Sequence, residues 1–360
     1  MNKSANDIYR LSHDLVRLMR RKGFLACWLF VLLAGERSYS QDIHFSQFFE
    51  TPLLRNPSLA GIFTGDYRVQ GVYRSQWNSV TNGYQTGSFN GEYKVQAGNG
   101  NNYITVGLQA LSDRAGTAGL ATTEVLPAFN YHKSLSNERN SYLSVGFMGG
   151  LVQKTIDLSK VTTNNQFDGS VFNPSMATGE SFATPSIHYL DGSIGISYST
   201  SFGQDPANNL FLGAALHHLN RPKNSFYQDA NELNLKYVYS AGVKMRLTDQ
   251  SYFTVQADQT VQGDFRETIA GCIISYKLGD DPAQSGYAVH FGALLRWRDA
   301  VIPVVKLDMN GLSVALSYDA NVSALKTASQ GSGGVELSVA YIGFTGRDNS
   351  VRDKVRCPRF

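Results

Sequence analysis

Apolar and polar positions alternate along most of this chain after its first forty residues, in short segments separated by turn-forming residues. The pattern is regular in residues 311–319, where one face would carry Leu312, Val314, Leu316 and Tyr318 and the other Ser313, Ala315, Ser317 and Asp319. Successive side chains of a β-strand point to opposite faces, so this period predicts strands with one apolar and one polar face. A long series of such strands is typical of a transmembrane β-barrel, whose apolar faces contact lipid.

The alternation recurs often enough to predict about fourteen strands, and an even number is typical of single-chain barrels of bacterial outer membranes. The first strand is expected at Tyr67–Trp77, and the longest apolar face lies in Leu235–Leu247. We therefore predict an all-β fold, a transmembrane antiparallel β-barrel of the bacterial outer membrane, over residues 67–345. Pro303 cannot donate a ladder hydrogen bond, which predicts an irregular twelfth strand.

Connection lengths give an independent test, because such barrels have short periplasmic turns and longer extracellular loops. Short connections are expected after even-numbered strands, at 97–101, 203–207, 248–250 and 310–311, and long ones after odd-numbered strands, at 155–191, 219–233 and 320–333. This arrangement places an N-terminal segment, 41–66, and a C-terminal tail, 346–360, in the periplasm. Whether segment 41–66 plugs the lumen and whether loop 155–191 folds inward stay open at this stage.

Residues 1–40 are predicted to form a secretory signal peptide. A basic stretch, Arg17–Lys22, precedes the apolar run Phe24–Leu33, and small residues precede Gln41. The run is shorter than the roughly twenty residues that a membrane-spanning helix needs. Cleavage is expected near Ser40, and a lipid anchor on Cys27 is disfavoured because this cysteine lies near the start of the apolar run.

Composition agrees with a barrel and excludes some partners. The chain has 34 Gly, 19 Tyr and 20 Phe but only 10 Pro and 17% charged residues, which suits strands with aromatic girdles better than a helical enzyme. A net charge of +3 is too small to predict a nucleic-acid partner. After cleavage only Cys272 and Cys357 remain, which is no disulfide framework, and Cys272 is expected on the lipid face.

Motifs for catalysis or metal binding are absent from the sequence, which has no phosphate-binding loop, zinc-protease motif, Cys-x-x-Cys pair or nucleophile elbow. The adjacent His217 and His218 are expected on opposite faces of a strand, so they are poorly placed to share a metal. Asp258, Asp264 and Glu267 are interpreted as part of a loop and lumen charge network. We therefore expect neither enzyme activity nor a cofactor or metal site.

A soluble β-sandwich or β-helix is the alternative fold, because its strands alternate in the same way. The barrel is favoured by apolar faces whose opposite faces carry Arg and Lys, and by the lack of an internal repeat of solenoid length. Closure into a barrel also removes the exposed edges that an open sheet would have to protect.

Three parts of the chain carry a family resemblance: Asp42–Gly61 with Tyr73–Trp77, Leu316–Leu325 with Gly333–Tyr341, and the final Cys357–Phe360. Together they resemble the start, the last hairpin and the C-terminus of the PorP/SprF family of type IX secretion system membrane proteins. The resemblance spans nearly the whole exported chain in order. Arg55 departs from it, since the family more often has an apolar residue before Asn-Pro.

The resemblance implies partner-binding or structural roles for residues in these segments. They are Ser46, Gln47, Asn56, Pro57, Gly61, Arg74, Gln76, Trp77, Tyr318, Asp319, Cys357, Pro358, Arg359 and Phe360. The N-terminal segment and the tail either contact partners or only seal the barrel, and the residues do not decide between these two roles.

Membership would imply a non-enzymatic outer-membrane barrel of the type IX secretion system that supports export or surface attachment of secreted proteins and adhesins. The implied partners are outer-membrane lipid, periplasmic ring components of the machinery or a peptidoglycan-binding lipoprotein, and the C-terminal sorting domain of a large adhesin. No nucleic acid is among them. The alternative function is an outer-membrane diffusion channel or hydrophobic-solute transporter, which a barrel with polar lumen residues would also support.

Deletion of Cys357–Phe360 tests the role of the tail. We predict that it lowers either assembly of the barrel or partner binding, measured as barrel in the outer-membrane fraction and adhesin displayed on the cell. Normal levels of both would contradict the prediction.

Overall fold

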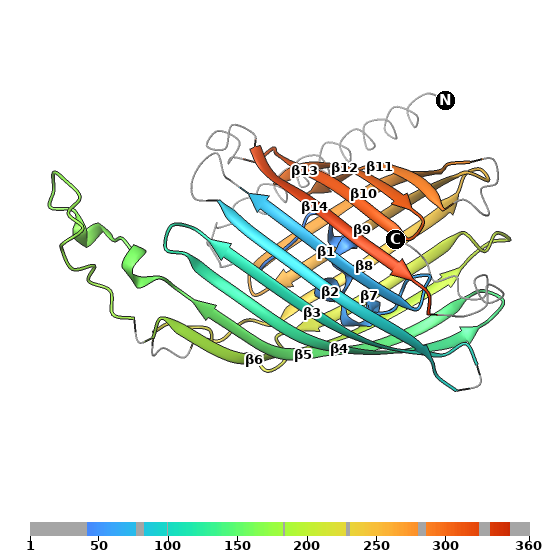
Figure 1. Ribbon diagram of the computed structural model, residues 1–360, viewed down its shortest axis with the longest axis horizontal. Coiled ribbons are helices and arrows are strands. Elements are labelled where there is room, and N and C mark those ends of the chain that lie inside the picture. The colour runs from blue at the N-terminus through green and yellow to red at the C-terminus, as the bar shows by residue number, and fades with distance from the viewer. Residues whose placement is uncertain are drawn as a thin grey trace, which may run out of the picture. The chain divides into compact units, whose positions relative to one another are not determined.

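The computed structural model of the protein describes residues 42–76, 83–98, 100–182, 184–227, 231–279, 286–323 and 332–345. In these residues fourteen antiparallel strands form one closed barrel (Figure 1). The strands are β1 (Tyr67–Gln76), β2 (Tyr84–Gln96), β3 (Tyr103–Ala115), β4 (Leu120–Ser136), β5 (Ser141–Thr155), β6 (Ser186–Ser201), β7 (Asn209–His217), β8 (Lys236–Arg246), β9 (Ser251–Gln262), β10 (Phe265–Lys277), β11 (Tyr287–Arg296), β12 (Ala300–Met309), β13 (Leu312–Asn321) and β14 (Ser332–Gly343). The predicted fold class and number of strands are confirmed.

The burial pattern of the strands follows the alternation of the sequence. In β13, Leu316 and Tyr318 are exposed on the outer face, whereas Ser317 and Asp319 are almost fully buried on the inner face. The other strands repeat this pattern, and Cys272 in β10 lies on the outer face as expected. An apolar outer surface is what a barrel needs where it meets lipid.

The ring closes between the first and last strands. The β1–β14 pair runs in register from Tyr67 opposite Gly343 to Gln76 opposite Gly334. Every strand of the described barrel is therefore hydrogen-bonded on both sides, and no backbone edge faces the hydrocarbon.

Two prolines interrupt the ladder without shifting its register. Pro303 lies in β12, where pairing with β13 stops after Val301 and resumes at Val304. Pro127 lies at a similar gap in the pairing of β4 with β5. The predicted irregularity of the twelfth strand is confirmed, and its cause is the missing backbone donor of proline.

The two ends of the barrel are named the odd rim and the even rim. The connections that follow odd-numbered strands lie at the odd rim, and those that follow even-numbered strands lie at the even rim. The longest connections, 156–185, 218–235 and 322–331, all lie at the odd rim as expected. Loop 156–185 is shorter than predicted, because β6 already begins at Ser186, opposite Thr155 of β5. The predicted alternation of short and long connections is only partial. Connection 263–264 at the odd rim is short, and connection 278–286 at the even rim is longer than the other connections there.

Residues 42–66, named the plug from here on, lie inside the barrel and appear in blue within the ring of strands in Figure 1. The plug contains three single-turn helices, η1 (Phe48–Glu50), α2 (Pro52–Arg55) and η2 (Pro57–Leu59). It begins at the odd rim and crosses the lumen to the even rim, where β1 starts. No helix in the described part of the chain is long and apolar enough to cross a membrane.

The lumen wall is less polar than the sequence pattern predicts, because it carries three apolar patches. The plug covers all three of them. Phe48 and Phe49 pack on buried residues of β10, β11 and β12. Leu53 and Ala60 pack on β4 and β5. Phe45 joins a third cluster with residues of β1 and β3. Burial of these apolar surfaces stabilises the plug in its position.

Candidate functional site

The plug makes a close approach to the barrel wall at Asn56 and Pro57. The fully buried Asn56 caps η2, and its Oδ1 accepts a hydrogen bond from the Ser58 amide at 2.9 Å. Its Nδ2 donates to the carbonyl oxygens of Ile196 and Ala214, each at 3.2 Å. These two residues lie opposite each other on β6 and β7, so one side chain joins the plug to two strands.

Three glycines on adjacent strands form the wall beneath this turn, and we name Gly146, Gly195 and Gly213 the glycine seat. A Cβ atom at Gly146 would overlap the Pro57 carbonyl, and one at Gly195 would overlap the Asn56 carboxamide. A Cβ atom at Gly213 would lie 3.1 Å from the Asn56 Nδ2. Glycine within a strand permits this close approach of another backbone.

The start of the plug is held by four charged side chains, Arg74, Arg296, Asp319 and Glu336, which we name the arginine–carboxylate cluster. They come from β1, β11, β13 and β14, near the odd rim. Arg74 forms ion pairs with Asp319 at 3.0 Å and with Glu336 at 2.8 Å. Arg296 pairs with Asp319 at 3.2 Å. All four side chains are almost fully buried.

The arginine–carboxylate cluster binds both backbone and side-chain groups of the plug. The backbone amides of Ser46 and Gln47 both donate to the Glu336 carboxylate, the second at 2.8 Å. Ser46 Oγ donates to Asp319 at 2.7 Å, and Gln47 Nε2 donates to Ser317 Oγ at 3.0 Å. The three bonds to the Glu336 and Asp319 carboxylates are charge-assisted, and such bonds are stronger than those between neutral groups.

Further ion pairs fix the middle of the plug. Arg55 pairs with Asp258 of β9 and donates to Ser240 Oγ at 3.1 Å. Glu50 pairs with Lys306 of β12. Arg55, Asp258 and the carboxylate of Glu50 are buried. Loss of one partner from such a buried pair typically costs about 3–5 kcal/mol, because the other charge is left without compensation.

At the odd rim the plug begins with Asp42, which contacts two basic side chains. Its carboxylate accepts hydrogen bonds from Lys236 Nζ at 3.0 Å and from His218 Nε2 at 3.0 Å. His218 Nδ1 lies 2.8 Å from Asp191 Oδ2. Burial by itself lowers the pKa of His218, but the hydrogen bonds to Asp191 and Asp42 outweigh it and raise the pKa to about 9.

The expectation that His217 and His218 point to opposite faces is wrong. His217 is the last residue of β7 and contacts the Arg55 carbonyl oxygen through Nε2 at 3.3 Å. His218 has a positive φ of 60° and is also buried. The left-handed conformation breaks the alternation of the strand, so both rings face the lumen. Among the described residues no group of His, Cys, Asp or Glu could hold a metal ion.

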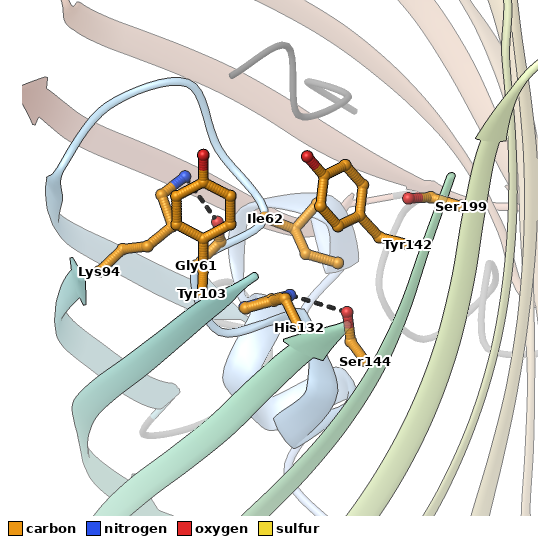
Figure 2. Close-up of a pocket in the computed structure, with 8 residues that line it drawn as sticks. All are labelled: Gly61, Ile62, Lys94, Tyr103, His132, Tyr142, Ser144 and Ser199. Atoms are coloured by element: carbon orange, nitrogen blue, oxygen red, sulfur yellow. Dashed lines mark hydrogen bonds between the residues drawn. The ribbon is translucent and has the colours of Figure 1, made fainter. Parts of the chain in front are cut away.

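At the even rim the plug ends beside a small pocket, whose lining residues are drawn in Figure 2. Lys94 Nζ donates to the carbonyl oxygens of Gly61 at 3.1 Å and Phe63 at 2.6 Å. The Gly61 amide donates to Glu92 at 2.7 Å, and its φ of +80° favours glycine. His132 Nδ1 lies 2.7 Å from Ser144 Oγ on the pocket wall. The backbone turn at Gly61 and Ile62 thus forms part of the lining of the pocket.

The structure joins several residues that the family resemblance selected. Ser46, Gln47, Arg74 and Asp319, from three distant parts of the sequence, meet at the arginine–carboxylate cluster. Asn56 and Pro57 lie on the glycine seat, and Gly61 lies at the even rim. Gln76 is the last residue of β1 and pairs with Gly334 of β14, and Tyr318 faces outward. Trp77, Cys357, Pro358, Arg359 and Phe360 lie outside the described residues.

Sequence reasoning missed Glu336, Arg296 and the partner of Arg55. Glu336 and Arg296 lie on the polar faces of their strands, and the alternation predicts both strands correctly. A charged residue at a lumen position was therefore a signal in the sequence that could have identified them. The pairing of Arg55 with Asp258 had no such signal, because these residues are 203 positions apart.

The sequence model of one protein family, described as type IX secretion system membrane protein PorP/SprF, matches residues 37–341. A search of curated proteins finds no matching sequence.

Among solved structures, the toluene transporter TbuX of Ralstonia pickettii is 9% identical with a TM-score of 0.45, over 81% of this chain and 92% of that one. A Pseudomonas aeruginosa FadL homologue is 9% identical with a TM-score of 0.44, over 81% and 94%. The translocator domain of the autotransporter NalP from Neisseria meningitidis is 12% identical with a TM-score of 0.40, over 78% and 88%. Similarities this remote carry no argument about function.

Replacement of Gly146 by alanine tests the glycine seat. We predict that Gly146→Ala lowers the free energy of unfolding by about 1–3 kcal/mol, because the new methyl group overlaps the Pro57 backbone. Gly192→Ala is the matched control, since a Cβ atom at Gly192 meets no atom within 4 Å. Urea unfolding of the detergent-solubilised barrel measures both variants, and equal midpoints would contradict the prediction.

The contact between His218 and Asp42 predicts a loss of stability at alkaline pH. A histidine whose pKa is raised on folding stabilises the fold below its unfolded pKa of about 6.5, and this contribution disappears as pH rises through about 9. It amounts to at most about 3 kcal/mol. Unfolding of native protein and of His218→Gln between about pH 7 and 10 measures it, and parallel pH profiles would contradict the prediction.

Proposed function

The chain belongs to the PorP/SprF family of type IX secretion system membrane proteins, and from this we propose that it is a non-enzymatic outer-membrane scaffold of that system. It supports the export or surface attachment of secreted proteins, including adhesins. The observation that carries the proposal is the plug, which is anchored at both rims and in the middle of the lumen. A barrel filled in this way is suited to act through contacts at its rims rather than through an open pore.

We infer that the even rim faces the periplasm and the odd rim the cell exterior, because the longest loops lie at the odd rim. The even rim then offers the end of the plug to periplasmic partners. Thr345, just after β14, is tied to Asp66 of the plug by a hydrogen bond of 2.9 Å from its backbone amide. This surface is proposed for ring components of the machinery or for a peptidoglycan-binding lipoprotein.

Two of the long loops at the odd rim, 156–185 and 218–235, support a contact with a secreted partner. The ring of Phe182 stacks on Tyr227 at 5.1 Å between centroids, and the Tyr227 hydroxyl donates to Glu180 at 2.8 Å. Loop 156–185 also exposes the large apolar side chains of Phe167 and Val171, which are 53% and 64% exposed. Loops with grouped exposed apolar side chains are typical of protein-binding surfaces, and we propose the C-terminal sorting domain of an adhesin as their partner.

Purification of the native protein from its outer membrane in mild detergent tests the proposal. We predict co-purification of periplasmic ring components, a peptidoglycan-binding lipoprotein or one large adhesin. A Phe167→Ser, Val171→Ser variant should lose the adhesin but keep the periplasmic partners, because the changed residues lie at the odd rim. A barrel recovered without partners would contradict the scaffold role.

Single-channel recording separates the scaffold from a diffusion channel or hydrophobic-solute transporter. We predict no steady conductance for the native barrel, and intermittent currents for Gly146→Ala, because loosening of the plug uncovers the lumen. Gly192→Ala should behave like the native protein. Steady ion or sugar flux through the native barrel would contradict the scaffold role and favour the channel.

A further inference from the structure

Four exposed polar side chains form one row across the outer face of the barrel, and we name them the polar row. Each member lies directly opposite the next on the adjacent strands β3 to β6: Ser112, Thr123, Gln153 and His188. Arg114, which is also exposed, faces outward from β3 two residues closer to the odd rim. Outward positions of a barrel strand are normally apolar, so these residues mark a different kind of contact.

The polar row lies at the edge of the apolar band. On the side away from the odd rim its neighbours are Val125, Leu151 and Leu190, whose side chains are exposed on the outer face. On β4 every outward residue between Thr123 and Lys133 is apolar or aromatic. These roughly ten residues, at about 3.4 Å each and a tilt of about 40°, cover about 26 Å of membrane, close to the usual height of such a band. The polar row therefore lies where lipid head groups begin.

Hydrogen-bond donors line this surface, and no negative charge lies on it. The side chain of Arg114 and those of the polar-row residues on β3, β4 and β5 form no hydrogen bond or ion pair with another described residue. No outward position of β2 to β6 carries Asp or Glu. Asp157, in the loop after β5, already pairs with Lys160 at 2.8 Å. Arginine binds phosphate through parallel N–H groups, and hydroxyl, carboxamide and imidazole groups bind sugar hydroxyls.

A polar row directly above exposed apolar side chains fits an amphiphile. We propose that Arg114 and the polar row bind the phosphorylated sugar head group of an outer-leaflet glycolipid, with Arg114 on the phosphate and the acyl chains on the apolar residues below. The row crosses three strand spacings, about 14 Å in all, which matches a disaccharide with several acyl chains better than the head group of one phospholipid. The bound lipid lies at the foot of loop 156–185, because β5 and β6 flank that loop.

The inference rests on the orientation inferred above, in which the odd rim faces the cell exterior, and it is independent of the protein partners. Co-purification of partners tests those partners, whereas lipid binding by the isolated barrel tests the polar row. The two can therefore fail separately.

Native mass spectrometry of the purified full-length barrel tests the proposal. Detergent exchange first removes endogenous lipid, and monophosphoryl lipid A or phosphatidylglycerol is then titrated into separate samples. Both lipids carry a phosphate, so a difference between them reports the sugar head group and the acyl chains. We expect one lipid A to bind the native barrel at least about tenfold more tightly than phosphatidylglycerol. Arg114→Ala should weaken the binding of lipid A about tenfold or more, because a charge-assisted bond to phosphate is lost.

Arg266→Ala is the matched control. Arg266 is also exposed and faces outward near the odd rim, but it lies on β10, across the barrel. The outward row beside it has only two polar residues on β9 and β10, Gln259 and Thr268, and these are hydrogen-bonded to each other. This variant should bind lipid A like the native protein.

A double variant, Gln153→Leu with His188→Leu, tests the row separately from Arg114. It should lower the affinity for lipid A to that for phosphatidylglycerol, because the sugar loses two of its hydrogen-bond partners. Equal binding of lipid A by the native and Arg114→Ala barrels would overturn the proposal, as would equal affinity of the native barrel for both lipids. Binding of phosphatidylglycerol in preference, dependent on Arg114, would overturn both the glycolipid and the orientation. Loss of a co-purified protein from Arg114→Ala, with lipid binding unchanged, would assign the surface to a protein instead.

Discussion

The close contact between the Asn56–Pro57 turn and the glycine seat is the constraint on which the rest of the structure depends. Because a methyl group at Gly146 or Gly195 would overlap the turn, the plug can occupy this depth only where neighbouring strands carry glycine. Once the turn is seated, the Asn56 side chain bonds to two strands, and the apolar residues on both sides of it reach their patches on the wall. A contact of a few atoms thus sets the register between the plug and the whole barrel.

Charged contacts then give the plug a unique orientation rather than a large gain in stability. The desolvation cost of buried ion pairs offsets much of their attraction, but a plug shifted by one residue would leave several buried charges without partners. The arginine–carboxylate cluster fixes the odd end through backbone amides, and Lys94 fixes the even end through backbone carbonyls. The lumen therefore resembles the interior of a folded protein more than a solvated channel.

In the proposed function, a filled lumen lets the barrel serve secretion through its rims rather than through an open pore. The strands provide a rigid cylinder in the membrane, and the surfaces left for partners are the loops of one rim and the plug end of the other. The stacked rings of Phe182 and Tyr227 belong to the first surface, and the hydrogen bond between Thr345 and Asp66 belongs to the second. In the proposed function these surfaces are separated by the thickness of the outer membrane.

The sequence by itself determined the barrel, the number of its strands and the apolar outer face of those strands, because the two-residue period is local and lipid requires an apolar outer face. It did not identify Glu336 and Arg296 as a site, although both lie on the polar faces of their strands. Only the tertiary structure decided that the N-terminal segment fills the lumen, that Gly146 and Gly195 lie opposite each other beneath it, and that Arg55 pairs with Asp258. These contacts join positions far apart in the chain, and they depend on strand register and on the left-handed turn at His218, which a local pattern does not encode.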